Sequence, residues 1–317
     1  MKQLIVSFAR WSPRRRRPAI LCLHDVGSRA WFEGFARELA ARVEIVPLEP
    51  LVAGRDDRPA RPQAALTFDD GCRSVATIVE PVASALGLPF TMFVCGEVME
   101  GGPAPWPDRV MRLAGALRVD RAAALWGWRG GAIPDAQGLV NRLKELPHDR
   151  IVAGLERGEA DLGDRLPAPP LEYLGVAEVR RLATNPLVTI GSHSHRHPIL
   201  ARLSHAEQVA DLERGVAALE RASGRRPRLF AYPNGKATDY DAGTIQTLRE
   251  LGIIAAVTTD QRPLGRHEDP YRLPRLGISA GDSLTKLELK WSLPWPSRGD
   301  RQEAVVRKEA RTQWPPA

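Results

Sequence analysis

The chain has 317 residues, of which 43% are hydrophobic and 26% charged, values that are ordinary for a soluble globular protein. Its formal net charge is +7, but no nucleic-acid motif accompanies the excess of arginine, so we interpret the charge as a solvated surface and expect no nucleic-acid partner. Three cysteines without a Cys-x-x-Cys pair argue against a disulfide framework and fit a reducing compartment.

The first segment of the chain is a basic N-terminal arm, residues 1–18. Its apolar stretch is too short for a signal-peptide core and is broken by Arg10 and by four arginines at residues 14–17. No apolar run is long enough to span a bilayer. We therefore expect a cytoplasmic protein whose arm could contact anionic lipid at a membrane surface.

Short apolar runs then alternate with amphipathic segments, which predicts repeated strand–helix–strand units. Strands are predicted at residues 19–23, 43–46, 64–68, 90–94, 188–190, 229–232 and 253–257. Helices are predicted at residues 31–41, 75–86, 204–223 and 245–251. The helix from Ser204 begins with a capping box to Glu207. This order predicts a parallel α/β sheet, open or closed into a barrel.

One stretch interrupts the alternation, and another follows it. Residues 101–171 contain Trp106, Trp126 and Trp128 with several glycines and prolines, and we interpret them as a partly helical insertion that forms a lid or substrate wall. The tryptophans could stack on a sugar or pack under the lid. We expect the barrel to occupy residues 19–291 and the tail, residues 292–317, to be loosely held.

Two adjacent carboxylates, Asp69 and Asp70, follow the predicted strand at residues 64–68. Gly71 allows the chain to turn there, and the carboxyl ends of parallel strands carry functional groups in α/β folds. Like charges side by side repel each other unless a cation holds one or a proton neutralises one. The alternative is that Asp70 caps the next helix and Asp69 is only solvated.

Three histidines, His193, His195 and His197, follow the predicted strand at residues 188–190 and should lie in the same layer as the aspartates. Imidazole and carboxylate groups are suitable ligands for zinc and similar ions. Two histidines and one aspartate would leave a coordination position open for water, which is typical of catalytic sites. The second aspartate could then act as the general base.

The two motifs, "TFDDG" and "HSHRHP", in this order resemble the polysaccharide deacetylase family, the NodB-homology domain of carbohydrate esterase family 4. The resemblance runs from about Ala19 to about Ser279. It implies a distorted (β/α) barrel of the NodB-homology type and a divalent metal, most often Zn2+. It also implies hydrolysis of an N-acetyl group from an amino sugar.

Carried over by position, the resemblance makes Asp69 the general base and Asp70, His193 and His197 the metal ligands. His195 falls on a variable position and is expected to lie in the second shell or on the rim of the site.

The later motifs of the family are altered in this chain. "LFAYPNG", residues 229–235, resembles the tyrosine–proline variant of a subset of the family, with Ala231 in place of an arginine. The backbone N–H of Asn234 would help to form the oxyanion hole, or the sequence is a plain turn. Arg275, in "DPYRLPRLGI", is proposed as the substitute partner of Asp69, with a surface salt bridge as the alternative.

The family's late histidine, its general acid, is missing, since no histidine follows His267. His24, in "LCLHDV" just past the first strand, is our prediction for the general acid, and His267 is the alternative. His148 and His205 are interpreted as surface residues.

These inferences together predict a metal-dependent deacetylase. The expected substrate is an amino sugar of a surface-polysaccharide or glycolipid precursor, for example a lipid-linked or nucleotide-linked N-acetyl sugar. One alternative is a deformylase or cyclic-amide hydrolase that uses the same metal site. A second alternative is a non-catalytic glycan-binding scaffold on the same barrel. The sequence predicts no particular oligomeric state.

Overall fold

The structure, a computed structural model, describes residues 17–53, 61–128, 133–265 and 267–292. The predicted N-terminal arm, except for its last two residues, and the predicted tail beyond Ser292 lie outside the described residues. Within the described part of the chain, no helix is both long and apolar enough to cross a membrane.

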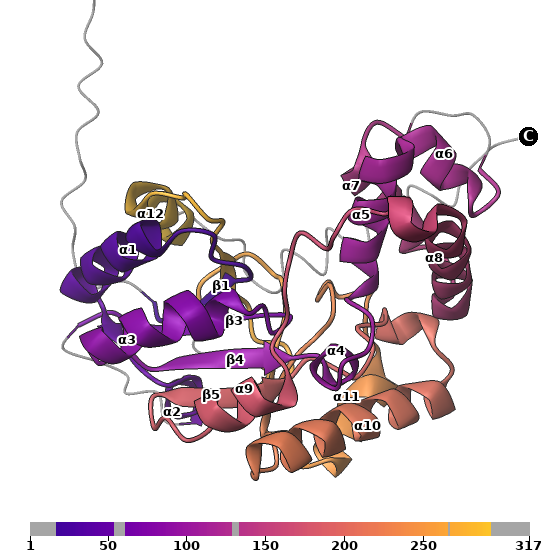
Figure 1. Ribbon diagram of the computed structural model, residues 1–317. Helices are drawn as coiled ribbons and strands as arrows, with labels where there is room; N and C mark the ends of the chain where they lie inside the picture. Colours follow the sequence, from indigo (N-terminus) through magenta and orange to yellow (C-terminus); the bar gives the residue numbers. More distant parts are fainter. Residues whose placement is uncertain (1–16, 54–60, 129–132, 266, 293–317) are drawn as a thin grey trace, which may run out of the picture.

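The described residues form an eight-stranded sheet in which every pair of neighbouring strands is parallel (Figure 1). Along the sheet the order is β7-β6-β5-β4-β3-β1-β8, and β2 pairs with the start of β3. The strands are β1 (Ala19–Leu23), β2 (Glu44–Ile45), β3 (Gln63–Phe68), β4 (Phe90–Val94), β5 (Val188–Ser192), β6 (Leu229–Ala231), β7 (Ala255–Val257) and β8 (Leu276–Gly277).

The two ends of the sheet are joined through the short segment that leads into β8. Leu273 forms a parallel bridge with Val257 of β7, and two residues later the Arg275 N–H donates to the Asp260 carbonyl. Leu276 then pairs with Leu21 of β1. The predicted distorted (β/α) barrel is therefore confirmed, and its irregular side lies at this segment, where β8 has only two residues.

Helices connect the strands and cover the outside of the sheet. The predicted cap of α10 is present, because the Ser204 side chain accepts from the Glu207 N–H and Gly224 ends the helix with φ 72°. A π-helical turn at Val75–Val79 precedes α3, whose second residue is a proline without an N–H. The helices are α1 (Arg29–Arg42), α2 (Leu48–Ala53), α3 (Glu80–Leu86), α4 (Gly96–Met99), α9 (Val176–Leu182), α10 (His205–Ser223), α11 (Ala242–Glu250) and α12 (Leu284–Ser292).

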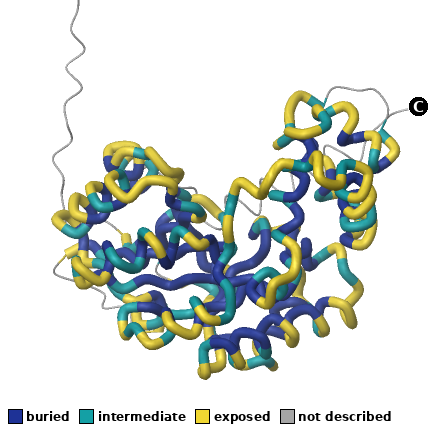
Figure 2. Tube along the Cα trace, viewed as in Figure 1, coloured by how far each residue is buried: buried dark blue, intermediate teal, exposed yellow. Residues whose placement is uncertain are grey.

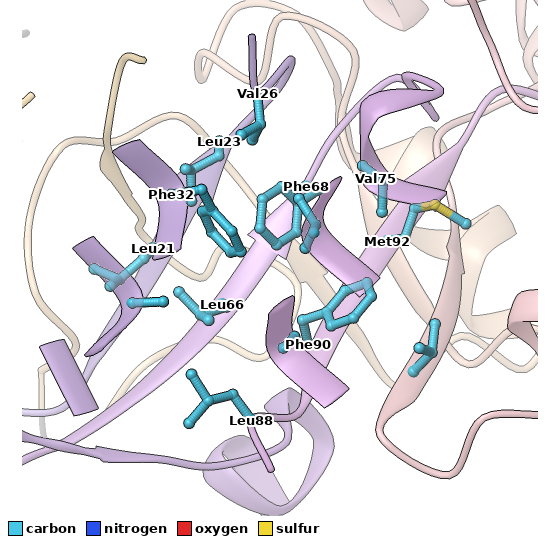
Figure 3. Packing of buried hydrophobic residues seen from close by; sticks show 14 of the residues in the cluster. Leu21, Leu23, Val26, Phe32, Leu66, Phe68, Val75, Leu88, Phe90 and Met92 are labelled. Atoms are coloured by element: carbon cyan, nitrogen blue, oxygen red, sulfur yellow. The ribbon is translucent and has the colours of Figure 1, made fainter. Parts of the chain in front are cut away.

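The main core lies between the sheet and its covering helices. Phe68 on β3 contacts Phe32 of α1 and Phe90 of β4 edge-to-face, with ring centroids 5.9 and 5.6 Å apart (Figure 3). Because side chains alternate along a strand, the residues adjacent in sequence to Phe68 and Phe90 face the barrel interior. Cys22 pairs in register with Thr67 on that inner side. Asp69, two residues after Thr67, lies on the same inner side just beyond the end of β3.

Between α4 and α9 the described residues form four α-helices that share an apolar cluster: α5 (Trp106–Leu117), α6 (Val119–Ala124), α7 (Ala136–Leu143) and α8 (His148–Leu162). Figure 1 shows this α5–α8 segment to one side of the sheet, and Figure 2 shows its buried residues gathered between the helices. Trp106 and Trp126 are 2% and 9% exposed within this cluster. Trp126 contacts Gly154 of α8 so closely that a Cβ there would lie 2.2 Å from the Trp126 Nε1. These two tryptophans pack in the core of the α5–α8 segment and are not free to stack on a sugar.

Candidate active site

The predicted site residues gather where the parallel strands end. The Asp69 N–H donates to the Leu23 carbonyl, which extends the β1–β3 pairing by one residue. In the same way, the His193 N–H donates to the Val94 carbonyl beyond β4. Since all strands run in one direction, His24, the two aspartates and the histidine turn meet at one edge of the barrel.

Asp70, His193 and His197 form a compact group that could hold a metal ion. The Asp70 Oδ1 lies 3.3 Å from the His193 Nε2 and 3.5 Å from the His197 Nε2. The two imidazole rings are 4.9 Å apart and tilted by 70°. Three potential ligand atoms therefore converge on one point at the end of the barrel.

The protonation of these groups fits a cation. The His193 Nδ1 lies 2.7 Å from the Ala231 carbonyl oxygen, which only accepts, so Nδ1 carries a proton and Nε2 can present a lone pair to an ion. The Asp70 Oδ1 is buried without a hydrogen-bond partner. A buried carboxylate oxygen that faces a lone pair is unfavourable unless a cation or a proton lies between them.

The surroundings favour an ionised Asp70 and a neutral His197, whereas burial would lower the pKa of His193 but its contact with Asp70 raises it. Burial alone would raise the pKa of Asp70, but the adjacent histidines hold that pKa well below its usual range. Burial, together with the nearby His193, lowers the pKa of His197 to about 3. Asp70 is consequently ionised and His197 neutral at physiological pH.

The backbone is strained around this group. Within the described residues, only five non-glycine residues have a positive φ, and four of them belong to the site: Asp70, Ser194, His197 and Asn234, with φ between 56° and 68°. Such conformations cost about 1–3 kcal/mol each when the surroundings impose them. The Ser194 Oγ accepts from the His197 N–H and closes the turn that brings His193 and His197 together.

Asp69 is fixed by Arg275 from inside the barrel. The Arg275 Nη1 and Nη2 donate to the two Asp69 oxygens at 2.7 and 2.6 Å, and the Arg275 side chain is fully buried. The arginine is itself held, because its Nε donates to the Thr258 carbonyl and its Nη1 to the Thr67 Oγ1. Burial would raise the pKa of Asp69, but Arg275 lowers it below the usual value. The alternative of a surface salt bridge for Arg275 is wrong.

Asp69 also receives a contact that the sequence did not suggest. The Cys22 Sγ lies 3.6 Å from the Asp69 Oδ2, within reach of a weak S–H hydrogen bond. Burial raises the pKa of this thiol far above its usual range, so Cys22 stays protonated. Cys22 therefore contributes a donor to Asp69 and no negative charge.

His24 lies at the open side of the two aspartates. Its Nε2 is 4.0 Å from the Asp69 Oδ2 and 4.0 Å from the Asp70 Oδ2, and its side chain is 55% exposed. His267 is exposed in the loop between β7 and β8, and no contact in the described chain connects it with either aspartate. The fold thus places His24, and not His267, beside the carboxylates.

Asn234 lies on the turn after β6, the strand whose last residue contacts His193. The turn starts at Ala231, whose carbonyl accepts from His193, and the Asn234 carbonyl accepts from the Thr259 Oγ1. Gly235 is needed in this turn, because a Cβ there would lie 2.9 Å from the Thr259 nitrogen. The residues "YPNG" therefore form a turn at the wall of the site.

Residues 159–256 match the family model for polysaccharide deacetylases. The predicted resemblance to this family is confirmed. The matched region contains the histidine motif and the Asn234 turn, whereas Asp69 and Asp70 precede it. A comparison with curated proteins found no match.

Solved structures of deacetylase-like proteins share the fold. The structure of IcaB from Ammonifex degensii superposes with a TM-score of 0.59 at 19% identity, covering 88% of this chain and 99% of that chain. The Streptococcus pyogenes deacetylase PplD, in complex with acetate, gives a TM-score of 0.55 at 15% identity, with 87% and 99% covered. A de-N-acetylase from Aggregatibacter actinomycetemcomitans gives 0.53 at 14%, with 86% and 99% covered.

Two of the three residues between His193 and His197, namely His195 and Arg196, are held by α10. The His195 N–H and the Arg196 Nε both donate to Asp211 of α10, at 2.9 Å each. His195 is buried and packs against Gly96. Asp211 was not predicted, although an acidic residue on the buried face of a helix was a signal that could have identified it.

One histidine prediction is wrong. His148 was expected at the surface but is 5% exposed at the start of α8. Burial lowers its pKa to about 4, so it is neutral at physiological pH. The prediction failed because the buried face of α8 extends to His148, the first residue of the helix. His205, in contrast, is exposed.

The sequence analysis also missed a hydrogen-bonded pair near the site, Asp108 and Tyr173. The Tyr173 hydroxyl donates to the Asp108 Oδ2, and Tyr173 forms an antiparallel bridge with Cys72, two residues after Asp70. Burial raises the pKa of Asp108, and the charge of Asp70 raises it further. The two residues are 65 positions apart, so no local pattern connects them.

Proposed function

We propose that this protein is a metal-dependent hydrolase that removes the N-acetyl group from an amino sugar of a surface-polysaccharide or glycolipid precursor. The observation that carries this proposal is the Asp70–His193–His197 group beside a buried Asp69–Arg275 ion pair. The family match and the shared fold support deacetylation as the reaction.

Asp70, His193 and His197 would hold the metal, for which we propose Zn2+ because two imidazoles and one carboxylate are a common catalytic zinc set. The buried, unpartnered Asp70 Oδ1 and the proton position on His193 fit such an ion. When bound, zinc supplies Lewis acidity to the acetyl carbonyl and to the attacking water.

The chain's own residues then move the protons. Asp69, kept ionised by Arg275, accepts a proton from the water as its oxygen adds to the acetyl carbon. The backbone N–H of Asn234 donates to the developing oxyanion. As the carbon–nitrogen bond breaks, His24 gives a proton to the leaving amine, and the products are acetate and the free amino sugar.

The proposal predicts acetate release that depends on the metal. Purified protein incubated with N-acetyl sugar conjugates should release acetate, chelation should abolish the release, and added zinc should restore it. His193→Ala should lose both the bound metal and the activity, because it removes one of three ligands. His205→Ala, at an exposed histidine, is the matched control and should keep both.

Other results would select the alternatives. Bound zinc with release of formate, or with opening of cyclic amides, and no acetate would favour the second enzymatic function. Sugar binding without metal and without turnover would favour the glycan-binding scaffold.

His24→Gln is expected to lower kcat by roughly a hundredfold, the lower end of what a positioned proton donor contributes. His24 lies beside both aspartates and outside the Asp70–His193–His197 group, so the variant should keep the metal held there. Cys22, His24 and Asp69 also lie close enough to hold a metal ion, but the Cys22 thiol stays protonated. His267→Gln should keep the wild-type kcat. Steady-state kinetics on both variants decides the point, and a loss confined to His267→Gln would reverse the assignment.

A further inference from the structure

We propose that a cavity next to the site binds the phosphate-linked lipid chain of the substrate. This inference rests on the proposed function, and it selects a lipid carrier over a nucleotide. The cavity measures about 370 Å³, within the usual range for small-molecule sites. It lies between α5, α8 and residues 166–173 of the chain that returns to the barrel.

The cavity adjoins the aspartate loop. Its wall includes Tyr173, which pairs with Cys72, and Asp108, which accepts from the Tyr173 hydroxyl. The Leu174 N–H donates to the carbonyl of Gly71, the residue that follows Asp70. A sugar held over Asp70 can therefore extend its anomeric substituent past Tyr173 into the cavity.

Most of the wall is apolar and rigid. Three prolines fix the backbone on two sides of the cavity, because their φ angles are restricted. A nucleobase would need polar groups to pair with its ring nitrogens and carbonyls, but most polar side chains of the wall are engaged with one another, Arg109 with Glu159 and Asp108 with Tyr173. A hydrocarbon chain needs no such partners. The apolar wall residues are Pro103, Ala104, Leu166, Pro169, Pro170 and Leu171.

The wall contains two arginines and two carboxylates, and of these Asp108 accepts from the Tyr173 hydroxyl. Arg109 is neutralised by a two-point ion pair with Glu159 of α8. The Arg112 Nε donates to the Pro167 carbonyl, and Arg112 has no carboxylate partner in the described parts of the chain. Its terminal nitrogens can therefore bind an anion at the edge of an apolar cavity, an arrangement that fits a lipid phosphate.

The test is calorimetric titration of the full chain with decyl phosphate below its micellar concentration. Decyl phosphate should bind at least about a hundredfold more tightly than inorganic phosphate, since several buried methylenes contribute. Arg112→Gln should weaken the binding of decyl phosphate by about tenfold or more, through loss of a charge-assisted hydrogen bond. Arg121→Gln, an exposed arginine of α6 away from the cavity wall, is the matched control and should bind as the wild type does.

Equal affinity for decyl phosphate and inorganic phosphate would overturn the proposal, as would tighter binding of a nucleoside monophosphate than of decyl phosphate, or an unchanged affinity in Arg112→Gln. The binding test for the lipid site and the acetate-release test for the proposed function can fail independently. Tight binding of decyl phosphate to a protein that releases no acetate would contradict the deacetylase, whereas acetate release without such binding would contradict only the lipid site.

Discussion

Asp69→Asn is expected to lower kcat by about two to four orders of magnitude, the usual contribution of a positioned general base. Asparagine has nearly the same shape but cannot accept the proton of the attacking water. The metal group consists of other residues, so the zinc content of the variant should match the wild type. Steady-state kinetics of acetate release and elemental analysis of the same preparations measure the two quantities.

Asp161→Asn, at an exposed aspartate on α8, is the control and should change neither quantity. Loss of zinc together with activity in Asp69→Asn would make Asp69 a ligand. A variant that kept more than about a tenth of the wild-type kcat would contradict its role as the base.

Arg275→Met should lower the free energy of unfolding by about 3–5 kcal/mol, because it leaves the buried Asp69 carboxylate without its partner. The Thr258 carbonyl and the Thr67 hydroxyl lose their donor as well. Urea denaturation followed by circular dichroism measures the change. Arg275→Lys should cost less, since it keeps the charge but not the two-point geometry.

A surface ion pair provides the comparison. Arg228 and Glu49 lie 2.6 Å apart but are 58% and 34% exposed, so Arg228→Met should cost less than about 1 kcal/mol. Combining Asp69→Asn with Arg275→Met should destabilise the protein less than the sum of the single changes, because the unpaired charge is gone. Additive losses would show that the ion pair does not couple the two residues.

From the sequence alone, seven of the eight strands could be predicted to within about two residues at each end. Because parallel strands finish at one edge, "TFDDG" after one strand and "HSHRHP" after another were sufficient to predict that Asp70, His193 and His197 would meet. The alternation of strands and helices likewise predicted a parallel sheet. Elements of two to nine residues, such as α2, α9, α12 and β8, were missed because their periodic patterns are too short to stand out.

The tertiary structure alone decided which distant residues become partners. Arg275 could have been a surface residue until the segment before β8 placed it inside the barrel against Asp69. The pairing of Asp108 with Tyr173 and the burial of His148 follow in the same way from the packing of α5–α8. Hydrogen bonds and burial depend on what lies across a contact, and local patterns carry information only about neighbours along the chain.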